Sequence, residues 1–199
     1  MKRRLVFGLP ILVAGCSVLP DRPFIESQRF TLEPRRAGPP RARSRHALLL
    51  RSMRAAPGLE LRGLRRMRAD GTMEVAPYEE WVAPPADLVE LALRQWLVAS
   101  GRFTAVTAPG SRLTTSLILE TELLVLQIEG NFARVSLAAL LLGQGGSLGE
   151  ARPLGQTTVE ARFSMEGARG STGQAAAMET ALQAALTQLE AWIVSSISV

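Results

Sequence analysis

Residues 113–142 read LTTSLILETELLVLQIEGNFARVSLAALLL, and this segment predicts two long strands joined by a tight turn. Side chains at every second position of a strand share one face. One face is expected to carry Leu117, Leu119, Thr121, Leu123 and Val125, and the other Ile118, Glu120, Glu122, Leu124 and Leu126. Gly130 and Asn131 suit a turn. Residues 132–142 are therefore expected to return antiparallel to residues 113–129.

Shorter strand patterns surround this pair. We expect strands at residues 29–33, 46–54, 64–68, 73–78, 103–107 and 154–165. Asp70 and Gly71 lie between two of them and favour a hairpin, because both tolerate the backbone angles of a tight turn.

Two segments carry apolar residues at helical spacing. Pro84 and Pro85 favour a helix start, followed by an apolar stripe over residues 88–97 that ends before Gly101. Residues 171–174, STGQ, resemble a capping box that opens a second helix. Its apolar face is formed by Met178, Leu182, Leu186, Leu189 and Ile193. The predicted fold class is α+β, a mainly antiparallel sheet with two amphipathic helices packed on it.

The first 16 residues have the pattern of a bacterial lipoprotein signal. A cationic start is followed by a short apolar run that ends in VAGC at 13–16. We expect residues 1–15 to be a signal peptide, Cys16 to carry the lipid, residues 16–28 to be a lipidated tether, and residues 29–199 to form one domain. Cys16 is the only cysteine of the chain, so no internal disulfide can form.

Charge is unevenly distributed. Of the net charge of +5, three positive charges belong to residues 2–4, which leaves +2 for residues 16–199. Residues 35–68 hold 11 arginines and one acid, whereas residues 69–199 hold 7 arginines and 14 acids. Two interpretations remain open: a cationic surface for anionic lipid or an acidic partner, or solvated arginines on a protein with a separate acidic face. Nucleic acid is not an expected partner of an exported protein.

The residues that catalysis needs are scarce. His46 is the only histidine, and the only cysteine is assigned to the lipid, so no ordinary zinc site is expected. Glu120 and Glu122 share a strand face and are interpreted as a solvated surface. The motifs of serine hydrolases and phosphate-binding loops are absent from the sequence. We therefore expect no catalytic residues, no metal site, no cofactor and no enzyme activity.

Several short segments, taken in order, resemble the ABC-type transport auxiliary lipoprotein family, which includes the paraquat-inducible protein C type lipoproteins. They are FTL at 30–32, AAPGL at 55–59, MR at 67–68, YEEWVAPP at 78–85 and SGRFTAV at 100–106. Phe30 stands where many members have tyrosine. The resemblance spans about residues 16–197.

The resemblance implies a non-enzymatic adaptor in the periplasm. Such lipoproteins accompany ABC transporters that carry mammalian-cell-entry (MCE) domain proteins and move phospholipid or other hydrophobic molecules between membranes. The implied partners are the MCE protein, the ABC permease and the ATPase, with the chain as a possible homo-oligomer. Tyr78, Trp81 and Pro84 are candidate interface residues, although a tryptophan before a helix, such as Trp81, more often anchors the core. Ser17 after Cys16, where inner-membrane lipoproteins usually have aspartate, favours the outer membrane.

A second function remains open. The domain could instead be a periplasmic lipid-binding carrier or chaperone that holds a hydrophobic ligand between its helices and its sheet. An apolar cavity there would favour the carrier, and a filled core with exposed apolar residues would favour the adaptor.

Overall fold

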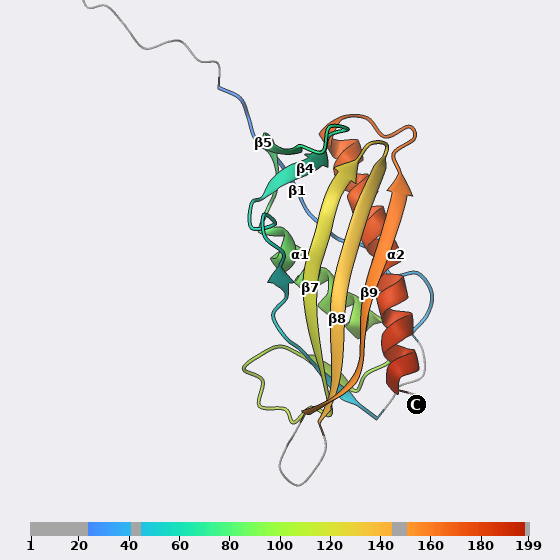
Figure 1. Cartoon of the computed structure of the whole chain (residues 1–199). Helices are drawn as coiled ribbons and strands as arrows, with labels where there is room; N and C mark the ends of the chain where they lie inside the picture. The colour runs from blue at the N-terminus through green and yellow to red at the C-terminus, as the bar shows by residue number, and fades with distance from the viewer. Residues whose placement is uncertain (1–23, 41–44, 145–150, 198–199) are drawn as a thin grey trace, which may run out of the picture.

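The computed structural model describes residues 24–40, 45–144 and 151–197. Cys16, the predicted signal peptide and most of the predicted tether lie outside the described residues. The described chain forms a mixed sheet with two helices against it, which confirms the predicted α+β class. Figure 1 shows the helices lying behind the three longest strands.

The predicted long hairpin is the centre of the sheet. Strands β7 (Leu117–Glu129) and β8 (Phe132–Gln144) pair antiparallel over their whole length, and β9 (Ala151–Ser164) pairs antiparallel with β8. The turn between β7 and β8 uses Gly130, which has a φ of +56°. The sequence therefore placed this pair correctly.

A β-bulge changes the inward face of β7. Leu123 pairs with Leu137 but Val125 pairs with Ser136, so one extra residue is inserted into β7. A bulge reverses which alternate residues point inward. Leu123 and Leu126 are consequently both in the core, at 0% and 1% exposure, although strict alternation placed them on opposite faces.

Short strands continue the sheet beyond the other edge of β7. Three of them pair parallel to β7 at successive positions along it: β2 (Ala47–Leu50), β3 (Arg54–Ala55) and β4 (Gly63–Met67). The outer strands are β6 (Ala105–Thr107) beside β2, β5 (Met73–Trp81) antiparallel to β4, and β1 (Gln28–Phe30) parallel to β5. The predicted β4–β5 hairpin is confirmed, with Asp70 and Gly71 in its loop.

Helix α1 (Pro85–Ala99) begins and ends where the sequence predicts. Proline is well suited to the first helical turn because that position needs no amide hydrogen. The chain leaves the helix through Ser100, which is buried, and Gly101, which has a φ of +65°. The predicted apolar stripe is buried except at Leu91, which faces solvent.

Helix α2 (Gly170–Ile197) packs along β7, β8 and β9. Its predicted apolar face is buried, with Met178, Leu182, Leu186, Leu189 and Ile193 all at 0% exposure. The capping box is not formed as predicted. Instead the Ser171 hydroxyl donates to Oε1 of Gln28 at 2.7 Å, and Oε1 of Gln174 accepts from Nε of Arg66 at 2.6 Å. These polar side chains tie the start of α2 to β1 and β4.

Candidate functional site

The three candidate interface residues do not share one surface. Tyr78 is 44% exposed and Pro84 is exposed, but Trp81 is only 1% exposed. The Trp81 ring meets Phe30 edge to face, with the ring centroids 6.5 Å apart. Trp81 is therefore a core residue, and Tyr78 and Pro84 are the members of the set that a partner could touch.

Further apolar side chains are exposed beside this stretch. Val82, directly after Trp81, is 40% exposed, and Leu61 is 59% exposed. The carbonyl of Arg62 accepts a hydrogen bond from the amide of Trp81 at 2.7 Å, so Leu61 and Val82 lie at the same end of the β4–β5 pair. We call Leu61, Tyr78, Val82 and Pro84, which are all exposed and lie in or close to the β4–β5 pair, the β5 patch. Exposed apolar side chains in such a group are typical of contact surfaces.

Many arginines of the arginine-rich region are paired with acids within the molecule, and several of these paired arginines stay exposed at the surface. Six arginines of this region have carboxylate partners: Arg36 with Glu190, Arg51 with Glu120, Arg54 with Glu122, Arg62 with Glu80, Arg66 with Glu79, and Arg68 with Glu74.

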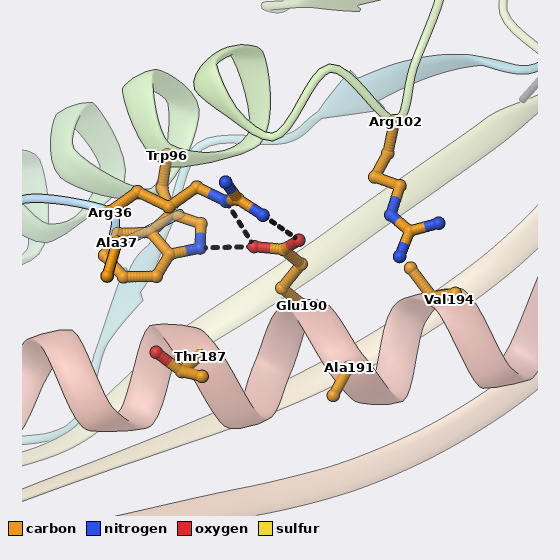
Figure 2. A pocket seen from close by; sticks show the side chains of 8 residues that line it. All are labelled: Arg36, Ala37, Trp96, Arg102, Thr187, Glu190, Ala191 and Val194. Carbon is orange, nitrogen blue, oxygen red and sulfur yellow. Dashed lines mark hydrogen bonds and ion pairs between the residues drawn. The ribbon is translucent and has the colours of Figure 1, made fainter. Parts of the chain in front are cut away.

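One of these pairs lies in a cleft between the segment after β1, the end of α1, and α2. Arg36 donates from Nε and Nη2 to the two carboxylate oxygens of Glu190, at 2.8 and 2.9 Å. Nε1 of Trp96 donates to the same carboxylate at 2.8 Å. Figure 2 shows the three side chains converging from three separate elements. The arginine and glutamate side chains are only 8% and 12% exposed.

The cleft has a volume of about 370 Å³ and a second arginine in its wall. Arg102 follows α1 and reaches toward α2 (Figure 2). Its Nε atom is buried and has no hydrogen-bond partner among the described residues. The remaining wall consists of Ala37, Thr187, Ala191 and Val194.

The surroundings of Glu190 stabilise its charged form. Burial alone would raise the pKa of its carboxyl, but hydrogen bonds from Arg36 and Trp96 and the charges of Arg36 and Arg102 outweigh that effect. The pKa of Glu190 is consequently held below its usual value. The hydrogen bonds to Glu190 likewise raise the pKa of Arg36.

Sequence reasoning missed this cleft. One signal was present: Glu190 is the only charged residue between positions 180 and 197, in an otherwise apolar or neutral helix. A lone carboxylate in such a helix indicates a specific partner, because burying an unpaired charge is costly. The identity of that partner was not readable, since Arg36 lies 154 positions earlier.

The few residues considered for catalysis are not brought together. Nδ1 of His46 lies 3.1 Å from the hydroxyl of Ser116, whereas Glu120 and Glu122 pair with arginines on a partly exposed strand face. No group of three histidine, cysteine, aspartate or glutamate side chains that could hold a metal is found in residues 24–40, 45–144 and 151–197. Neither described helix is long and apolar enough to cross a membrane.

A family model, described as the ABC-type transport auxiliary lipoprotein component, matches residues 30–193. A search of curated proteins finds no match. Among solved structures, a Xanthomonas campestris protein of family model DUF330 is 20% identical, with 86% of this chain and 97% of that chain covered and a TM-score of 0.71. A hypothetical protein of Chlamydia trachomatis is 9% identical, with 75% and 96% covered and a TM-score of 0.54. These structural likenesses concern the fold.

Proposed function

The chain belongs to the ABC-type transport auxiliary lipoprotein family, and from that premise we propose that it is a non-enzymatic adaptor of an MCE-type transporter. In this role it is anchored to the outer membrane through lipid on Cys16 and reaches into the periplasm. There it docks on the MCE protein of a system that moves phospholipid or another hydrophobic molecule between membranes.

The filled space between helices and sheet is the observation that supports an adaptor over a lipid carrier. A carrier of the kind considered would hold its ligand between α1, α2 and the sheet. Those positions are occupied by side chains at 0% exposure, namely Leu93, Leu119, Leu137, Met178 and Leu186. Interiors packed in this way leave no room for a lipid chain without repacking. The β5 patch, by contrast, offers exposed apolar groups for a protein partner.

The anchor can be tested directly. In Cys16→Ser the thiol that accepts the lipid is absent, so the variant should leave the membrane fraction or accumulate as uncleaved precursor. Each buried methylene of an acyl chain contributes about 0.8 kcal/mol, so losing whole chains should abolish stable anchoring. Membrane fractionation and incorporation of labelled palmitate measure this. Palmitate incorporation by Cys16→Ser at the wild-type level would contradict the assignment.

The docking role is tested by capturing the MCE protein of the same transport system on the full chain in non-ionic detergent. We expect Tyr78→Ala to lower the apparent affinity about tenfold, a loss of about 1.4 kcal/mol. Leu113→Ala is the matched control, because Leu113 is similarly exposed, at 50%, but lies outside the β5 patch. Since the described arginines are largely paired internally, capture should persist at high salt.

One outcome would argue against the adaptor, and another against the β5 patch as its docking surface. The first is no capture of the MCE protein at any salt concentration, together with a stoichiometric lipid in the purified chain. The second is equal loss of capture in Tyr78→Ala and Leu113→Ala, which would remove the β5 patch from the proposed interface.

A further inference from the structure

We propose that the cleft between α1 and α2 is a binding site for a phosphate-type oxyanion, held by Arg102. This inference concerns a surface away from the β5 patch and does not depend on an MCE partner. It rests on the charges in the cleft, on the absence of a carboxylate within ion-pair distance of Arg102 in the described chain, and on the composition of the walls.

The charges in the cleft do not balance. Arg36 and Glu190 neutralise each other through two hydrogen bonds, and Glu190 also accepts from Trp96. The carboxylate is therefore already engaged from three directions, and it makes no ion pair with Arg102. Arg102 therefore gives the cleft one excess positive charge, which favours the binding of an anion there.

Arg102 differs from most arginines of the described chain. Many of them are paired with carboxylates, as Arg51 and Arg134 illustrate, whereas Arg102 has no carboxylate within ion-pair distance among the described residues. A guanidinium presents five N–H donors in a planar fork that matches the oxygens of phosphate. Its buried Nε has no acceptor within the described protein, so the guanidinium is incompletely hydrogen-bonded, and an oxyanion on its outer nitrogens would compensate its charge.

The walls suit a small phosphate ester. The volume of about 370 Å³ falls in the range of roughly 300–1,000 Å³ that is typical of small-molecule sites. Ala191 and Val194 provide apolar surface on the same side of Glu190 as Arg102, whereas Ala37, Trp96 and Thr187 line the other side (Figure 2). A phosphate with a short organic substituent would place its oxygens on Arg102 and its carbons on Ala191 and Val194.

The test is calorimetric titration of the full chain in non-ionic detergent at constant ionic strength. Three probes separate the sources of the phosphate group: inorganic phosphate, glycerol 3-phosphate, and phosphatidylglycerol in mixed micelles. Arg102→Gln removes the charge and the fork while keeping a long polar side chain. Arg112→Gln is the matched control, because Arg112 is exposed, lacks a carboxylate partner in the described chain, and lies outside the cleft.

We expect at least one probe to bind the wild type, and Arg102→Gln to bind it at least tenfold more weakly while Arg112→Gln is unchanged. Tighter binding of phosphatidylglycerol than of the soluble probes would identify a lipid headgroup, and equal binding of inorganic phosphate would identify a free oxyanion.

Ala191→Glu is the second variant, since it places a carboxylate in the cleft wall while Arg102 is kept. It should lower affinity as well. Absence of binding by every probe, or equal affinity of Arg102→Gln and wild type, would overturn the proposal.

Discussion

Replacing Glu190 with alanine is expected to lower the free energy of unfolding by about 3 kcal/mol. Removing one partner of a buried ion pair typically costs about 3–5 kcal/mol, because the other charge stays buried without compensation. In this molecule Arg36, only 8% exposed, would lose both carboxylate contacts, and the indole N–H of Trp96 would lose its acceptor. The lower end of the range applies because the pair lines an open cleft that water can enter.

Urea unfolding measures this effect as a lower midpoint at an unchanged slope. Glu166→Ala is the control, because Glu166 is exposed in the turn before α2 and makes no ion pair in the described chain. Its substitution should change the stability by less than about 0.5 kcal/mol. A similar small change in Glu190→Ala would show that Glu190 and Arg36 contribute little to folding.

The ion pair of Arg36 and Glu190 also predicts how the stability difference between wild type and Glu190→Ala depends on pH. The pKa of Glu190 is lowered in the folded protein. Its contribution to stability is therefore fully present above its pKa in the unfolded chain, about 4.3, and is lost as the pH falls through its pKa in the folded protein. The stability difference between wild type and Glu190→Ala should therefore be largest near neutral pH and shrink in acid below about pH 4. A difference that stayed constant into strong acid would contradict the charged pair as its source.

The elements of the fold were predictable where a local pattern determines them. The long hairpin follows from strand alternation around a glycine turn, and α1 follows from prolines before an apolar stripe and a glycine after it. The bulge in β7 was not predictable, because residues 123–126, LLVL, are apolar at every position and fit either inward phase. The parallel pairing of β2, β3 and β4 with β7 was also missed, since it depends on long-range packing.

The candidate interface and the ion pairs were likewise not predictable from local sequence patterns. Trp81 and Pro84 stand out in the sequence, yet only the structure shows that one is buried and the other exposed. At residues 35–68, the acids that pair with Arg36, Arg51 and Arg54 come from α2 and β7, far along the chain, whereas those that pair with Arg62, Arg66 and Arg68 come from the neighbouring strand β5. Ion pairs between distant segments follow no local spacing rule, so charge counts along the chain did not reveal them.

Replacing Trp81 with alanine is expected to lower the free energy of unfolding by about 3–5 kcal/mol, the range for a buried aromatic residue. The side chain is 1% exposed and packs edge to face on Phe30, so its removal leaves a cavity next to β1. Trp81→Phe retains an aromatic ring, so its free energy of unfolding should fall by less than that of Trp81→Ala. Urea midpoints for both variants provide the measurement.

Tyr78→Ala separates folding from docking at neighbouring positions of one strand. Tyr78 is 44% exposed, so its removal should change the stability by no more than about 1 kcal/mol while weakening capture of the MCE protein. Trp81→Ala should show the reverse: a large loss of stability, with capture of the MCE protein reduced only because part of the protein is unfolded. If Trp81→Ala instead kept the wild-type midpoint but failed to capture the partner, Trp81 would be an interface residue, and the chain would have to open at β5 to present it.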